Sequence, residues 1–139
     1  MIDYLDLMEE HKREIDQFPL FFAFNDEGIE EGKRKVNAKE DDKIVHVGMN
    51  GFVKKADLDA FKDMLDRHEK EHYKNMLESQ EYVYHMVKYE LANHEYNISY
   101  DVTDAFEACG LTDGIIRENP RIDEAVNLAI KDFKAENGM

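Results

Sequence analysis

The stretch from Asp57 to Tyr96 constrains the fold most, because it predicts two consecutive amphipathic helices. Asp57 is a suitable N-cap for the first helix, which we expect to end near Leu77. Ser79 is a suitable cap for the second helix, and so short a connection predicts that the two helices form an antiparallel hairpin. One stripe of the first helix, at spacings of three and four residues, contains Leu58, Phe61, Leu65, His68, His72 and Met76.

Three short segments before this hairpin predict a small sheet. Leu20–Phe24 is a short aromatic run bounded by a proline and an asparagine, which is typical of a buried strand. Lys43–Gly48 is rich in β-branched residues, and the Asn50-Gly51 pair that follows is a strong hairpin signal. Phe52-Val53 begins the return strand, so we expect about three antiparallel strands.

Helix start and stop signals divide the rest of the chain. Ile2–Phe18 reads as an amphipathic helix that a proline ends, and Asn25 or Asp26 can cap a short helix through Lys35. Asn97–Tyr100 is expected to be extended, as an edge strand. The remaining helices are expected from Asp101 or Thr103 to Gly110, from Thr112 to Glu118, and from Pro120 to the end of the chain.

These elements predict an α+β fold that is mostly helical. Its centre is an antiparallel helical hairpin packed with a small antiparallel sheet. A chain of 139 residues can form one modest core, so we expect a single domain over residues 1–139.

The charge balance narrows the classes of partner. The chain has 32 acidic and 18 basic residues and a net charge of −14. Phosphate contacts need a basic surface, so direct binding to nucleic acid is disfavoured, as is binding to an anionic membrane. A basic protein partner fits, because an acidic surface steers such a partner electrostatically. Solubility alone is the competing explanation of the same charge.

Cys109 is the only cysteine, so the chain has no internal disulfide. We interpret Cys109 as a small packing residue at a helix end and not as a nucleophile. No signal peptide or long apolar run is present, so we expect a cytoplasmic protein that does not span a membrane. The sequence leaves the oligomeric state open between a monomer and a homodimer.

The only catalytic pattern is His68-Glu69-Lys70-Glu71-His72, which matches the zinc-peptidase motif H-E-x-x-H. On a helix, histidines four residues apart share a face and can bind one zinc ion while the glutamate activates water. In the expected hairpin His68 would lie near Glu90, and Glu90 or His94 could serve as third ligand. The surroundings are strongly polar, however, so a non-catalytic metal site and half-exposed histidines on a helix–helix seam are the alternatives. We assign no catalytic residue and no required cofactor.

Two further groups are candidates for binding a small ligand. Asn93, His94 and Tyr96 combine an amide, an imidazole and a stacking face at a helix end. Arg117 and Arg121 flank a proline, and a phosphate or carboxylate could sit between them. A helix C-cap explains the first group equally well, and ordinary surface pairing with neighbouring acids explains the second.

Three segments carry a resemblance to a known family: Phe18–Asn25, Gly51–Asp57, and Tyr89–Tyr96 with Ile98–Asp101. The chain resembles a family of small uncharacterised proteins from phages, prophages and chromosomes of Gram-positive bacteria, over roughly Ile2 to Phe133. The family has no assigned activity, so the resemblance implies no functional residue. It implies a context in which small acidic proteins inhibit host machinery or host defence.

The expected function is therefore non-catalytic binding. We expect an acidic, phage-related protein that inhibits a basic host protein, such as a nucleic-acid-binding protein or a defence nuclease. The acidic helices, especially Asp57–Glu78, would form the contact face. Two alternatives stay open: a small zinc hydrolase that uses His68, Glu69 and His72, and a protein that binds or sequesters a small ligand such as a nucleotide.

Overall fold

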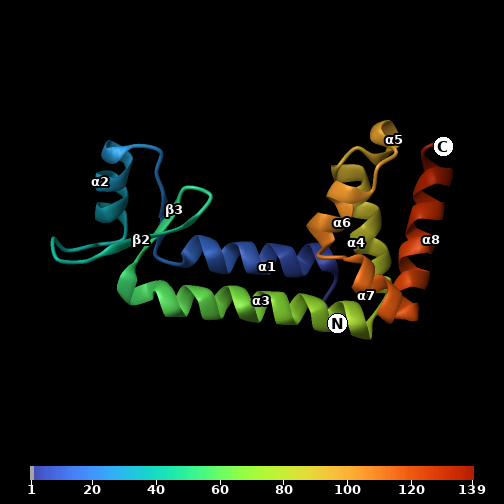
Figure 1. Ribbon diagram of the computed structural model, residues 1–139, viewed down its shortest axis with the longest axis horizontal. Helices are drawn as coiled ribbons and strands as arrows, with labels where there is room; N and C mark the ends of the chain where they lie inside the picture. The colour runs from blue at the N-terminus through green and yellow to red at the C-terminus, as the bar shows by residue number, and fades with distance from the viewer. Residues whose placement is uncertain (1) are drawn as a thin grey trace. The chain divides into compact units, whose positions relative to one another are not determined.

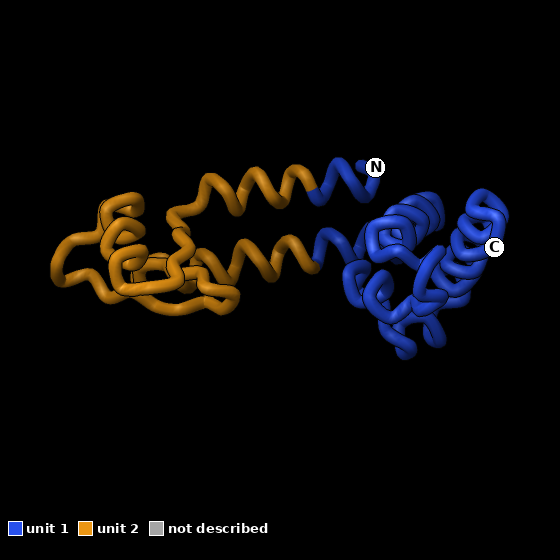
Figure 2. Tube along the Cα trace, turned by 90° about the horizontal axis from the view of Figure 1, so that it is seen from above, with its two compact units in different colours: residues 1–8, 70–139 blue, residues 9–69 orange. Residues whose placement is uncertain are grey.

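The computed structural model describes residues 2–139 and has an α+β, mostly helical fold, as predicted. Within these residues there are eight α-helices, one 3-10 helix and three strands (Figure 1). The chain divides into two compact units, Glu9–Glu69 and Met1–Met8 with Lys70–Met139, coloured separately in Figure 2. We call the first the sheet unit and the second the helical unit. Helices α1 (Tyr4–Gln17) and α3 (Leu58–Glu78) contribute residues to both.

The sheet unit is built around three antiparallel strands in the order β1-β3-β2, which confirms the predicted sheet. The strands are β1 (Leu20–Phe22), β2 (Ile44–Gly48) and β3 (Gly51–Lys54). β2 and β3 are joined by Met49 and Asn50, which both have left-handed backbone angles, with φ of 49° and 62°. The tight turn therefore lies one residue earlier than the Asn50-Gly51 signal suggests.

Each face of this sheet has its own small core, because successive strand residues point to opposite sides. On one face Leu20 and Val53 pack against Phe61 and Met64 of α3. On the other, Phe21 lies under α2 (Asp26–Lys35). A Cβ at Gly32 of α2 would come within 1.9 Å of the Phe21 ring. Glycine is therefore required for this close approach, although it weakens the helix signal in the sequence.

The helical unit is built around α4 (Gln80–Asn93). Its buried residues lie on more than one side of the helix, because α4 packs mainly against α8 (Pro120–Glu136) and α6 (Thr103–Cys109). Ser79 caps α4 as predicted, its hydroxyl accepting from the backbone N–H of Tyr82. α4 was expected to lie back along α3, but it leaves the end of α3 at a steep angle (Figure 1). Short helices α5 (Tyr96–Ser99) and α7 (Asp113–Glu118) complete the unit.

Several local expectations hold and three do not. Asn25, Thr112 and Gly110 cap helices as predicted. The segment Asn97–Tyr100 is not an edge strand, because Tyr96–Ser99 forms one helical turn between left-handed residues at Glu95 and Tyr100. The strand from Leu20 ends at Phe22 and is only partly buried. On the stripe of α3, Leu65 is exposed and Met64 is buried in its place.

None of the helices formed by residues 2–139 is both long and apolar enough to cross a membrane.

Candidate functional site

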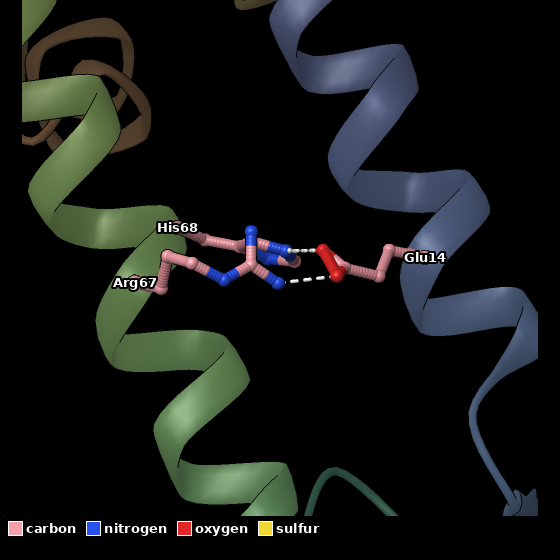
Figure 3. Close-up of polar contacts among 3 residues, drawn as sticks. All are labelled: Glu14, Arg67 and His68. Atoms are coloured by element: carbon pink, nitrogen blue, oxygen red, sulfur yellow. Dashed lines mark hydrogen bonds and ion pairs between the residues drawn. The ribbon is translucent and has the colours of Figure 1, made fainter.

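A carboxylate on α1 joins two adjacent side chains of α3 within the sheet unit (Figure 3). Oε1 of Glu14 lies 2.6 Å from Nε2 of His68, and Oε2 of Glu14 pairs with Arg67. A carboxylate can only accept, so His68 donates from Nε2. The hydrogen bond from His68, and next the one from Arg67, holds the pKa of Glu14 below its usual range. These three residues link α1 to α3.

A second buried imidazole completes this cluster. The ring of His11 stacks on that of His68, with centroids 3.9 Å apart and planes inclined by 13°. The nitrogen lone pairs of stacked rings lie in nearly parallel planes and do not converge on one point. The arrangement therefore suits packing and hydrogen bonding better than the joint ligation of a metal.

His72 has a separate set of partners within the helical unit. Its Nε2 lies 2.7 Å from the carbonyl oxygen of Cys109, and its Nδ1 lies 2.6 Å from the hydroxyl of Tyr82. The carbonyl only accepts, so Nε2 carries a proton, and in the neutral ring Nδ1 accepts from Tyr82. To bind a metal, His72 would have to give up one of these hydrogen bonds.

The two histidines of the H-E-x-x-H pattern therefore have different protein partners. Glu90 and His94, the two expected alternatives for the third ligand, pair instead with each other, and Nε2 of His94 lies 3.4 Å from Oε2 of Glu90. Within residues 2–139 no group of three or more histidine, cysteine, aspartate or glutamate side chains is arranged to hold a metal ion. A zinc site would thus need a rearrangement of His68, His72 or Glu90.

Glu90 is a buried carboxylate, only 5% exposed. Burial raises its pKa, and the nearby His94 partly opposes that rise. The same unit contains Cys109, whose pKa burial also raises, so the thiol stays protonated. Cys109 is fully buried in the core, which agrees with its interpretation as a packing residue.

The predicted ligand group at the end of α4 does not converge on a pocket. Asn93 is exposed, and His94 is the C-cap of the helix. Tyr96 is buried and packs edge-on against Phe133, with ring centroids 5.9 Å apart. Its ring is therefore part of the core and offers no open stacking face to a ligand.

Arg117 and Arg121 are both exposed, in α7 and at the start of α8. Among the described residues neither forms an ion pair within 4 Å. The backbone carbonyl of Arg121 accepts from the side chain of Gln80, 2.9 Å away. Binding of an anion between these arginines stays a prediction.

One hollow of the helical unit is a groove between α4 and α8, which no sequence pattern indicated. It has a volume of about 300 Å³. Its apolar lining residues are the buried Ala125 and the half-exposed Leu128. Its other lining residues are polar or acidic: Gln80, Glu81, Tyr84, Glu124 and Asp132. The mixture suits a ligand with an apolar stem and a cationic head.

At one end of the groove, contacts within the protein already stabilise a cationic side chain, that of Lys88. The hydroxyl of Tyr84 donates to Asp132 over 2.5 Å, and this hydrogen bond is the main reason that the pKa of Tyr84 is raised. Nζ of Lys88 lies 5.3 Å from the centre of the Tyr84 ring and donates to Glu136 at 2.7 Å. Carboxylates and an aromatic face therefore stabilise a lysine here, by the same forces that would bind a cation from another chain.

The groove joins residues that are distant in the sequence. Gln80 and Glu124, for example, are 44 positions apart, and their side chains lie 3.4 Å from each other. The sequence shows that α8 contains acidic residues, but only the packing of α8 on α4 brings them opposite Glu81. No local motif could have identified this arrangement.

Comparison with known proteins gives a family and no activity. No curated protein and no solved structure matches the chain. A family model described as a family of unknown function (DUF7659) matches residues 3–132. The chain is therefore a member of the uncharacterised DUF7659 family.

Proposed function

We propose that the protein is a non-catalytic binding protein that docks on a basic protein partner through the acidic surface of its helical unit. The observation that carries this proposal is the groove between α4 and α8, which carboxylates from both helices line together with Ala125 and Leu128. A lysine or arginine side chain would lay its stem on Leu128 and place its charge near Glu81 and Glu124.

The distribution of charge supports this choice of surface. The helical unit has 16 acidic and 7 basic residues, whereas the sheet unit has 16 acidic and 11 basic residues. Nine of the fourteen excess negative charges therefore belong to the helical unit. α3, which we first expected to form the contact face, has six acidic and four basic residues, and α4 and α8 together also have six and four, so the charge of the helices alone does not choose between these faces. We assign the contact face to α4 and α8 because the groove between them brings Glu81 and Glu124 together beside Leu128.

The resemblance to proteins of phages and Gram-positive bacteria suggests a setting for the partner. In this proposal the protein acts in the cytoplasm as an inhibitor of a basic host protein, such as a nucleic-acid-binding protein or a defence nuclease. Its carboxylates would occupy positions where the host protein otherwise binds phosphates.

An affinity capture tests the proposal. Tagged protein is incubated with nuclease-treated lysate of a Gram-positive bacterium, washed at low and high salt, and the bound proteins are identified by mass spectrometry. We expect one basic protein that is retained at low salt and released at high salt, because exposed charge pairs are screened by ions.

Two charge-neutral variants make this test specific to the groove. Glu81→Gln with Glu124→Gln removes two negative charges from the rim, and Glu9→Gln with Glu10→Gln removes two from exposed positions of the sheet unit. We expect the first pair to lose most of the captured partner and the second to retain it. Equal capture by both variants, or capture that salt does not affect, would contradict the proposal.

A further inference from the structure

Three large apolar side chains of the sheet unit, from neighbouring stretches of backbone, are strongly exposed. Phe22 is 62% exposed, Phe24 is 84% exposed and Met49 is 93% exposed. Large exposed apolar side chains that lie together are uncommon on a folded protein unless they form a contact surface. We call these three residues the aromatic patch.

Backbone pairing brings the three residues together. Phe22 lies opposite Gly51 in the ladder between β1 and β3, and a Cβ at Gly51 would lie 3.4 Å from its ring. The backbone N–H of Ala23 donates to the carbonyl of Asn50 over 3.0 Å. Phe22 to Phe24 therefore lie alongside the turn that presents Met49. Phe22 is the exposed end of β1, and Phe24 is exposed in the bend that leads to α2, while Ala23 between them is buried.

The anchoring of the patch favours recognition over disorder. β1 is paired with the central strand of the sheet, and the neighbouring Phe21 is buried and stacks on Phe52, with ring centroids 5.5 Å apart. The exposed rings are thus attached to a fixed backbone, and a partner would not have to order this segment on binding. Aromatic and methionine side chains on a rigid support are typical of the residues that dominate binding energy at interfaces.

Charges beside the patch indicate the chemistry of the occupant. Asp26 and Glu27 follow Phe24 closely and are exposed in the first turn of α2. Among the described residues no lysine or arginine forms an ion pair with either of them. The sequence from Phe18 to Gly32 has four acidic residues and no basic one. The patch therefore combines an apolar centre with a negative edge.

We propose that the aromatic patch is a docking site for a protein segment that carries an apolar side chain next to lysine or arginine. The apolar side chain would lie among Phe22, Phe24 and Met49, and the basic side chain would meet Asp26 and Glu27. This site belongs to the sheet unit and does not require the groove between α4 and α8. The acidic edge disfavours an anionic lipid surface as the occupant.

A peptide selection tests this proposal even while the natural partner is unidentified. The complete protein is immobilised and used to select from a phage-displayed library of random peptides, each about twelve residues long, which is enough to span a short contact. We expect the enriched peptides to combine an apolar residue with lysine or arginine. Their synthetic forms should bind Phe24→Ser about tenfold more weakly than the unchanged protein, and a Phe22→Ser, Phe24→Ser variant more weakly still.

Matched variants distinguish binding at the patch from nonspecific hydrophobic binding. Ile98→Ser removes an apolar side chain that is 71% exposed in the helical unit, and we expect it to leave peptide binding unchanged. Asp26→Asn with Glu27→Gln should weaken binding and reduce its dependence on salt. All these side chains are exposed, so each variant should keep the circular dichroism spectrum and unfolding midpoint of the parent, which verifies that it is folded.

Four results would overturn the proposal. They are enrichment of no peptide, enrichment of peptides that lack basic residues, equal binding to Phe24→Ser, and a dimer in sedimentation analysis that Phe24→Ser dissociates. The last result would show that a second copy of the chain occupies the patch. Loss of peptide binding in the Glu81→Gln, Glu124→Gln variant would show that the peptides bind in the groove and not at the patch. The failure of this proposal is therefore distinguishable from that of the proposed function.

Discussion

The two units of this chain use their apolar side chains differently. Among residues 2–139, seventeen buried residues of the helical unit form one continuous core around α4. In the sheet unit the buried residues form two separate clusters of four and three, one on each face of the sheet. The sheet unit also keeps two phenylalanines and a methionine at its surface.

We propose that this difference separates stability from recognition. The helical unit has the larger core and presents carboxylates to solvent, with Ile98 and Tyr100 also exposed, so its surface is suited to electrostatic attraction. The sheet unit leaves aromatic side chains unburied on a small but rigid support, so its surface is suited to short-range apolar contact. The predictions that follow test this contrast, first through the cores and then through the buried and partly buried charges.

The largest effect is expected from equal truncations in the two cores. Met86 is fully buried in the middle of α4, and Met64 is buried in the smaller cluster of the sheet unit. Met86→Ala should cost about 4 kcal/mol in the free energy of unfolding, and Met64→Ala about 2 kcal/mol, because a small cluster can relax around the lost atoms. Urea unfolding of both variants measures the difference. Equal costs would mean that the two cores are equally well packed.

Gly32→Ala tests the close approach between α2 and the sheet. The added Cβ would lie 1.9 Å from the buried ring of Phe21, so the ring or the helix must move. We expect a loss of about 3 kcal/mol, near the upper end of the range for overpacked cores. Gly114→Ala in α7 is the control, because its Cβ would meet its nearest neighbour at an ordinary 3.8 Å. Thermal unfolding should show a large decrease for the first variant and none for the second.

The capping residues illustrate what could be predicted from the sequence. Asn25, Ser79 and Thr112 cap helices by accepting a hydrogen bond from a backbone N–H three residues along the chain. This interaction is local, so the residue type and its position relative to the helix are enough to predict it. The fold class and the positions of β1, β2 and β3 followed from equally local patterns.

The polar clusters could not be predicted in the same way. Glu14 and His68 are 54 positions apart, and His72 meets a carbonyl 37 positions away. Sequence spacing placed His68 and His72 on one helix face, but partners on other elements decide what each imidazole does. The turn at Tyr96–Ser99 was missed for a related reason. Burial of Tyr96 against Phe133 holds a helical turn in a segment whose composition resembles a strand.

Glu90→Gln tests the buried charge of the helical unit. Burial raises the pKa of Glu90 above the ordinary value of 4.5, so ionisation of this carboxyl opposes folding. This cost to stability is fully present above the raised pKa of the folded state, and it disappears as the pH falls below the ordinary pKa of the unfolded state. We therefore expect Glu90→Gln to raise the unfolding midpoint at pH 7 and to have little effect near pH 4, in scans of the variant and parent at both pH values. A lower midpoint at pH 7 would show that the pair with His94 outweighs the cost of burial.

Glu14→Gln tests a partly exposed carboxylate, in contrast to the buried carboxyl of Glu90, and should have the smallest effect. Hydrogen bonds from His68 and Arg67 lower the pKa of Glu14, so the ionised carboxyl stabilises the folded state. This contribution is present above the ordinary carboxyl pKa and is lost as pH falls through the lowered one. The variant should therefore be slightly less stable than its parent at pH 7, and the difference should vanish in acid. Glu9→Gln, at an exposed position of the same helix, should leave the stability unchanged both at pH 7 and in acid.

One titration tests the division between the two surfaces most directly. The affinity for the captured basic partner is measured at low and high salt for the parent, for Glu81→Gln with Glu124→Gln, and for Phe24→Ser. The account predicts that the groove variant loses affinity mainly at low salt and flattens the salt dependence. It predicts that Phe24→Ser, which changes the separate site of the sheet unit, keeps the affinity and the salt dependence of the parent for this partner. An unchanged salt dependence in the groove variant, or an equal loss of affinity in Phe24→Ser, would contradict it.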